Sequence, residues 1–199
     1  MALDEILDYS DDWTVRVCIV HDGYQVAEAD HVWQLPLGPV EIGRAEPTAA
    51  VLSALDSASP SDFLLDEEHH YTEWGASGAT HSLILTLGEM AAEGVVGELV
   101  WEALRRLGRR ASDAAAAPGP NRPLERDEAI ERARWHVAAA FKSAEQEPDA
   151  LQLVGETMYE DGSWVVELQE DEVNYEVRLE EREGLVGPSR ISRRLRETR

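Results

Sequence analysis

The chain has 199 residues, and its 40 aspartates and glutamates against 18 lysines and arginines give a formal net charge of −22. This charge argues against binding to nucleic acid, whose phosphates are contacted by basic side chains, and against binding to anionic membrane surfaces. It favours solubility and basic protein partners. The single cysteine, Cys18, cannot form an internal disulfide, and the first residues are acidic, so we expect a cytoplasmic protein.

The first half of the chain begins with a strand pattern. Large apolar residues alternate with other residues over 13–19, and this period of two fits a half-buried strand. An Asp-Gly turn follows, and a second strand is expected over 24–35. A short helix is expected over 47–55, with Pro47 at its first position. A third strand is expected over 67–74.

A long helix is then expected over 81–107, with many small residues that include Gly88, Gly94 and Gly97. A glycine inside a helix costs about 1 kcal/mol relative to alanine, so such a series is best tolerated where another backbone comes close. The close neighbour is either the protein's own sheet or a second helix in a homodimer. A break into two helices near Gly94–Gly97 is a further alternative. Four glutamates within 83–104 argue against a membrane-spanning helix.

Residues 113–123 are rich in alanine and proline and offer no large apolar side chain for burial, so we expect a linker there. It separates a module at 1–112 from a module at 124–199. The second module is expected to begin with a helix over 124–144. Three strands follow, over 151–159, from 164 and from 175. A helix that covers one face of an antiparallel meander gives an α+β fold of two small modules.

Short motifs in the second module resemble a known family. They are Asp-Gly-Ser-Trp at 161–164, Tyr-Glu-Val at 175–177, Gly-Leu-Val-Gly at 184–187 and the arginines of 190–194. Over residues 124–196 the chain resembles the PepSY-type α-β-β-β module and, more narrowly, gas-vesicle accessory protein O. This resemblance implies a non-catalytic accessory or scaffold role. The chain departs from the family at Ser163, which separates glycine from tryptophan, and has a shorter segment between the second and third strands.

The segment Asp66–Glu73 is the one cluster that suggests metal chemistry. Carboxylates and imidazoles of His69, His70 and Glu73 are ligand types for zinc, manganese or iron. On a strand, however, His69 and His70 point to opposite faces, and the spacing is not His-Glu-x-x-His. A small metal-dependent enzyme is therefore the alternative hypothesis, and an acidic, solvated loop or edge strand is the simpler one.

Two further features are candidates for a catalytic or cofactor site. Cys18 lies opposite the apolar face of the first strand, which favours a packing role over a nucleophilic one. The glycine-rich segment 75–78 lacks the Gly-Lys-Ser/Thr ending of a phosphate-binding loop. We therefore expect no cofactor.

The charge is unevenly distributed. Residues 1–104 hold 20 acidic residues against two arginines, whereas the last ten hold five arginines, including Arg190, Arg193 and Arg194, against one glutamate. The basic segment is expected to dock on the acidic first module, in the same chain or another copy, or to contact an acidic partner. The leading prediction is a non-enzymatic interaction or accessory protein that binds another, basic protein. A conflict-system or immunity component fits the charge, and a gas-vesicle-type accessory fits the second module.

Overall fold

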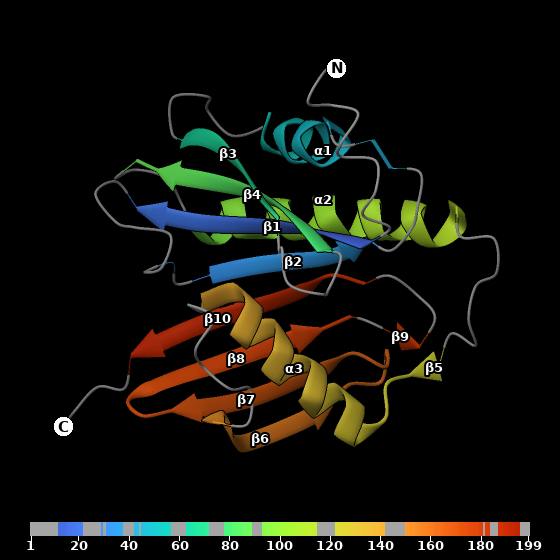
Figure 1. Cartoon of the computed structure of the whole chain (residues 1–199), viewed down its shortest axis with the longest axis vertical. Coiled ribbons are helices and arrows are strands. Elements are labelled where there is room, and N and C mark those ends of the chain that lie inside the picture. Colours follow the sequence, from blue (N-terminus) through green and yellow to red (C-terminus); the bar gives the residue numbers. More distant parts are fainter. Residues whose placement is uncertain are drawn as a thin grey trace.

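A computed structural model describes the chain over residues 12–21, 29, 31–37, 42–43, 45–56, 63–71, 78–88, 93–114, 122–141, 150–180, 182–183 and 187–195. In these residues, three helices pack on a mixed sheet of eight strands in the order β3-β4-β1-β2-β10-β8-β7-β6 (Figure 1). The expected α+β class is confirmed.

The N-terminal half of the sheet is built from β1 (Asp12–His21), β2 (His31–Leu37), β3 (Phe63–Tyr71) and β4 (Gly78–Leu87). β1 runs antiparallel to β2 and parallel to β4. β3 runs antiparallel to β4 and forms one edge of the sheet. Two helices of this half, α1 (Ala45–Leu55) and α2 (Glu93–Ala114), pack against each other.

The C-terminal half begins with α3 (Arg126–Phe141) and continues with β6 (Gln152–Met158), β7 (Trp164–Glu170) and β8 (Val173–Leu179) as an antiparallel meander. The last strand, β10 (Ser189–Leu195), is inserted between β8 and β2. The short strands β5 (Arg122–Pro123) and β9 (Arg182–Glu183) form a separate pair.

The two halves share one sheet through the pairing of β10 with β2. This pairing joins four residue pairs, from Ser189 opposite Gln34 to Ser192 opposite His31. The linker expected over 113–123 lies mostly outside the described residues, at 115–121. The division into modules at 1–112 and 124–199 stays a prediction, whereas the sheet runs across it.

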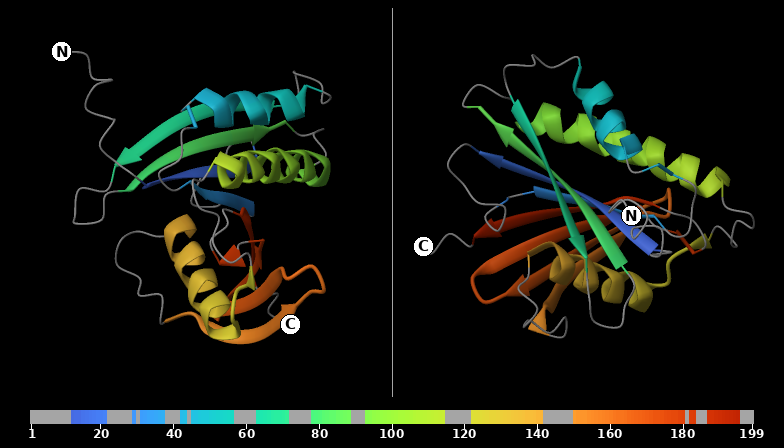
Figure 2. Two further views of the ribbon diagram at one scale, coloured as in Figure 1. Left: turned by 90° about the vertical axis from the view of Figure 1, so that its right-hand side faces the viewer. Right: turned by 45° about the horizontal axis from the view of Figure 1, so that its top comes forward.

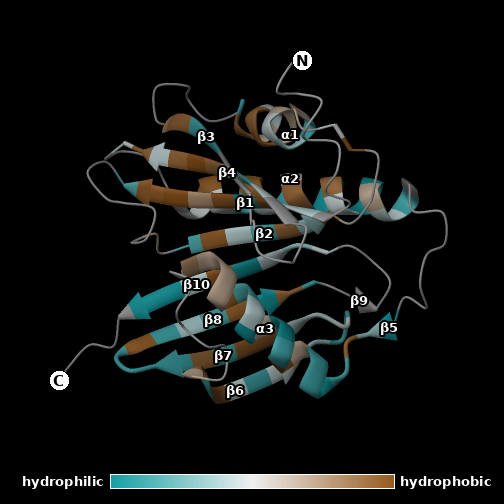
Figure 3. Cartoon of the chain, viewed as in Figure 1, coloured by the Kyte–Doolittle hydropathy of each residue, from teal (hydrophilic) through white to brown (hydrophobic). Residues whose placement is uncertain are grey.

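Two hydrophobic cores lie on opposite faces of this sheet. α1 and α2 cover one face of the N-terminal half, and α3 covers the other face of the C-terminal half (Figure 2). In β1, Val15 and Val17 face the α1/α2 core, whereas Cys18 and Val20 face the α3 core. β1 and β4 consist largely of hydrophobic residues, while the C-terminal strands contain both hydrophilic and hydrophobic stretches (Figure 3). Because successive side chains of a strand point to opposite faces of the sheet, β1 contributes buried residues to both cores.

The prediction of a helix over 81–107 is wrong for its first part. The chain forms β4 there, and α2 begins only at Glu93. Leu83, Leu85 and Leu87 are fully buried in the α1/α2 core. Leucines at 83 and 87 fit a helical spacing, but adding Leu85 gives the period of two typical of a strand. Pairing with β1 on one side and β3 on the other completes the strand.

Other element bounds differ from expectation by a few residues. The third strand, expected over 67–74, lies at Phe63–Tyr71, and the helix expected over 47–55 lies at Ala45–Leu55. The second strand, expected over 24–35, is β2, and residues 24–28 lie outside the described residues. The expected helix and strand meander of the second module are present as α3 and β6–β8. In the described part of the chain, every helix is too short or too polar to cross a membrane.

Candidate interaction surfaces

The acidic part of the predicted cluster lies on the edge strand β3. Asp66, Glu67 and Glu68 are all exposed. Asp66 and Glu68 lie opposite Ile84 and Ser82 of β4, on the sheet face away from α1 and α2. Leu64 shares this face by alternation and is 70% exposed. β3 therefore presents one apolar and two acidic side chains on this face, with the carboxylate of Glu67 on the other face.

The same strand carries the residues predicted as metal ligands. His69 and His70 are consecutive residues of β3, and Glu73 lies outside the described residues. His69 is in register with His81 of β4. Among the residues that the structure describes, no group of three His, Cys, Asp or Glu side chains is placed to hold a metal ion. The metal site therefore stays a prediction.

His81 is a buried histidine that the sequence analysis did not single out. It is 4% exposed, and its Nε2 lies 3.2 Å from Thr48 Oγ1 on α1 and 4.0 Å from Glu67 Oε2 on β3. The ring of Trp13 packs edge-on against it. His81 thus links α1 to the edge of the sheet.

The three glycines predicted as an interface do not lie on one helix. Gly88 follows β4, whereas Gly94 and Gly97 belong to α2. A Cβ atom at Gly97 would lie 3.1 Å from Cζ2 of Trp33, but a Cβ atom at Gly94 would meet no atom within 4 Å. Gly97 therefore allows α2 to approach β2 closely, which favours packing on the protein's own sheet. Gly94 is exposed, and a homodimer contact there stays a prediction.

The arginines predicted as a basic tail lie on β10, inside the sheet. Arg190 Nη1 donates to Glu98 Oε1 of α2 at 3.1 Å, and its guanidinium lies 5.5 Å from the centre of the Trp33 ring. Arg193 lies over the ring of Phe141. Arg194 is exposed. Arg190 therefore contacts the N-terminal half of the same chain, whereas Arg193 contacts α3 of the C-terminal half.

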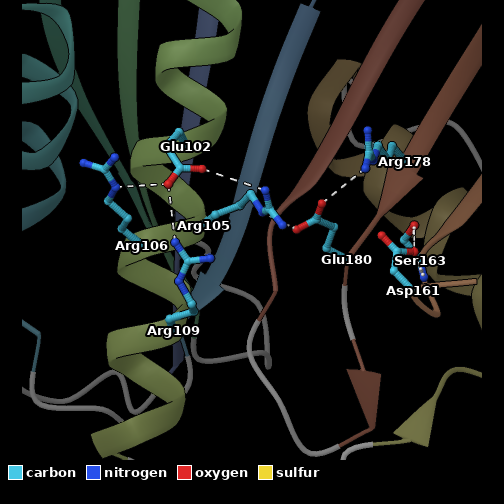
Figure 4. A network of polar contacts seen from close by, with 8 residues as sticks. All are labelled: Glu102, Arg105, Arg106, Arg109, Asp161, Ser163, Arg178 and Glu180. Carbon is cyan, nitrogen blue, oxygen red and sulfur yellow. Dashed lines mark hydrogen bonds and ion pairs between the residues drawn. The ribbon is translucent and has the colours of Figure 1, made fainter.

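A network of arginines and glutamates joins α2 to β8 (Figure 4). Glu102 accepts hydrogen bonds from Arg106 at 3.1 Å and Arg109 at 3.4 Å. The hydrogen bond from Arg106, together with the neighbouring arginine charges, lowers the pKa of Glu102. Arg105 Nε lies 2.7 Å from Glu180 Oε2, and Glu180 also pairs with Arg178 at 3.4 Å. These four arginines therefore share two carboxylates within the chain.

A polar cluster holds the junction of the two halves on the opposite face. His136 Nδ1 of α3 lies 2.6 Å from Gln34 Oε1 of β2 and 3.3 Å from Ser189 Oγ of β10. Gln34 is 3% exposed and Ser189 is fully buried. A polar residue at position 34 of an apolar strand was the only sequence signal, because its partners are known only once β2 and β10 are paired.

Cys18 is confirmed as a packing residue. Its side chain is fully buried in the α3 core. Burial raises the pKa of its thiol to about 11, with Arg16 acting in the opposite direction and Glu68 adding to the rise. The group is therefore a neutral thiol near pH 7, which is the unreactive form.

The other edge of the sheet, β6, has a different character from β3. Val154, Met158 and the following Tyr159 are 59%, 55% and 51% exposed. The only ionisable side chain of the strand, Glu156, accepts a hydrogen bond from Arg126 Nε at 2.7 Å. The two edges of one sheet are thus acidic and apolar, respectively.

Comparison with known proteins adds no relative: no family model, no curated protein and no solved structure matches the chain. The resemblance of residues 124–196 to the PepSY-type module stays a prediction.

Proposed function

We propose that this protein is a non-enzymatic interaction protein that binds a basic protein partner along its acidic edge strand β3. The observation that carries the proposal is the exposure of Asp66, Glu67 and Glu68 on the outermost strand of the sheet. Glu67 also lies 4.0 Å from His81, so the proposal rests on the place of these side chains at the sheet edge and not on unpaired charge. Three acidic side chains in a row on the outermost strand give a basic segment of another chain a continuous acidic contact.

The outer side of β3 also offers a main-chain edge. In the described part of the chain, β3 pairs with one strand only, β4. An extended segment of a partner can add to such an edge, with main-chain hydrogen bonds giving affinity and alternate side chains giving specificity. A segment with basic residues opposite Asp66 and Glu68 and an apolar residue near Leu64 would match this row.

The charge of the whole chain supports the same partner. A net charge of −22 attracts a basic protein at long range and accelerates its association. This attraction is screened by salt, so binding should weaken steeply as ionic strength rises. A conflict-system or immunity component that neutralises a basic effector in the cytoplasm is the biological role that fits this behaviour best. A gas-vesicle-type accessory held by apolar contacts would bind with little dependence on salt.

The experiment compares capture of proteins from a cell extract by the native chain and by two charge-matched variants. The test variant carries Asp66→Asn, Glu67→Gln and Glu68→Gln, and the control carries Glu125→Gln, Asp127→Asn and Glu131→Gln on the exposed surface around α3. We expect the native chain and the control to retain a basic protein that elutes with salt, and the test variant to bind it at least tenfold more weakly. Equal loss in both variants would mean general ion exchange and would contradict the proposal.

A further inference from the structure

The two edges of the sheet are protected to different degrees. An open edge strand invites pairing with another chain, and charged side chains are a common way to prevent it. β3 carries three exposed carboxylates. β6 carries Val154 and Met158, each more than half exposed, and a single carboxylate that is bridged to Arg126. Three of the seven exposed large hydrophobic residues found in the described part of the chain fall within the short stretch 154–159.

We propose that β6 is the contact edge of a homodimer, in which the β6 strands of two copies pair antiparallel about a twofold axis. Exposed apolar residues gathered on one edge typically mark an interaction site. An antiparallel pair of identical strands is self-complementary and closes on itself, so it needs no further surface and does not propagate. The contact is independent of the acidic edge β3, which lies at the other end of the sheet.

The charges of the edge favour a second copy over the basic partner. With Glu156 neutralised by Arg126 at 2.7 Å, β6 offers a basic segment no unpaired carboxylate in the strand itself. A second copy therefore meets no unpaired carboxylate along the strand. The apolar side chains of one edge are matched by those of the other.

A β-bulge in β6 limits the length over which the β6 strands of two copies can pair. The register of β6 against β7 shifts between Leu153 and Gly155, so Val154 is the additional residue. A bulge bends the strand locally and interrupts regular pairing. The pairing in the dimer therefore runs over 155–158, because the N–H and carbonyl of Tyr159 are already bonded to Ser163 and Gly162 in the following turn. Met158 lies in the contact, and the side chains of Val154 and Tyr159 lie at its margins. Such a short pairing predicts a weak dimer that forms at high protein concentration.

Acidic turns lie at both ends of this edge and give the dimer a characteristic salt dependence. Glu160 and Asp161 follow β6, and Asp171 and Glu172 join β7 to β8 near the start of β6; all four are exposed. In an antiparallel pair, the turn at one end approaches the acidic turn of the other copy. Salt screens this repulsion. The homodimer should therefore tighten as salt is added, whereas binding to a basic partner should weaken.

The test is sedimentation equilibrium of the full chain over a wide range of protein and salt concentrations. The test variant is Val154→Gln with Met158→Gln, and the control is Leu64→Gln with Trp135→Gln, which removes two exposed apolar side chains elsewhere. These substitutions leave the charge unchanged. We expect the native chain and the control to dimerise with an affinity that rises with salt, and the test variant to dimerise at least tenfold more weakly.

Three results would overturn the proposal. They are a native chain that stays monomeric at all concentrations and salt levels, equal weakening in both variants, and a dimer that dissociates as salt is added. Far-UV circular dichroism establishes that each variant is folded, and hydrogen exchange of the native chain gives a second readout. The amides of 155–158 that point away from β7 should become better protected at higher protein concentration, whereas those of β3 should not. Loss of the dimer alone would leave binding of the basic partner intact.

Discussion

At Gly97, α2 crosses β2 with the ring of Trp33 directly beneath it. Trp33 is fully buried, and both Cζ2 and Cη2 of its ring lie within 3.4 Å of the position that a Cβ atom would occupy. The guanidinium of Arg190 also lies over this ring, 5.5 Å from its centre. A side chain at Gly97 would have to displace a tryptophan that has little room to move, because protein interiors are closely packed.

This contact predicts opposite effects for two substitutions in one helix. Gly97→Ala should lower the free energy of unfolding by about 1–2 kcal/mol, because overpacking outweighs the gain in helix propensity. Gly94→Ala, where a Cβ atom meets open space, should leave it unchanged or raise it by up to about 1 kcal/mol. Urea unfolding of both variants and the native chain measures the difference. Equal effects would show that Trp33 adjusts freely.

The buried thiol of Cys18 predicts a dependence of stability on pH. Its pKa is raised from 9.0 to about 11 by burial, so above pH 9 the unfolded chain loses this proton while the folded chain keeps it. The folded state then binds more protons, and its stability should fall as pH rises from about 9 to 11. Below pH 9 the contribution is fully present. The free energy of unfolding, measured against pH for the native chain and Cys18→Ala, should show a steeper fall in the native chain. Parallel curves would mean that the thiol ionises equally in both states.

Elements with strong local signals were predicted well. α3 was predicted from an apolar face with helical spacing, and β6–β8 were predicted from a period of two with short turns between the strands. All of these signals lie next to each other in the sequence. The bounds differ by a few residues, as in α3, which was expected over 124–144 and lies at Arg126–Phe141. Local patterning is sufficient where an element and its neighbours are adjacent in the chain.

Elements whose identity depends on distant partners were predicted less well. The segment of β4 was assigned to a helix, because leucines at 83 and 87 suit either structure until pairing with β1 and β3 is known. The insertion of β10 beside β2 has no local signal, since His31 and Ser192 are 161 positions apart. The acidic residues of β3 were identified from sequence, and an edge strand was one of two simple interpretations of them, beside a loop. His81 and His136 were missed because their partners lie on other elements.

At the scale of the whole molecule, the two cores are coupled through the strands that they share. β1 and β2 contribute residues to both cores, through Val17 and Cys18 and through Trp33 and Val32. Loss of either core exposes one face of these strands. The two halves should therefore unfold together, although their helices lie on opposite faces of the sheet.

This coupling is tested by one large-to-small substitution in each core. Leu85→Ala in the α1/α2 core and Leu168→Ala in the α3 core remove side chains that are at most 1% exposed. Each should lower the free energy of unfolding by about 2–5 kcal/mol and shift the same single transition. Urea unfolding followed by circular dichroism and tryptophan fluorescence should give coincident curves. If either substitution split the curve into two steps, the halves would be separate folding units.

The position of β10 also affects the order in which the chain can fold. β2 emerges early during synthesis, but the strand that covers its free edge is made of residues 189–192, at the other end of the sequence. Until those residues leave the ribosome, β2 remains an open edge in a partly formed sheet. Contacts between such distant segments slow folding, and unpaired edges promote aggregation of intermediates. Dependence of folding on chaperones in the cell would thus arise from the four residue pairs that join β2 to β10 in the middle of the finished sheet.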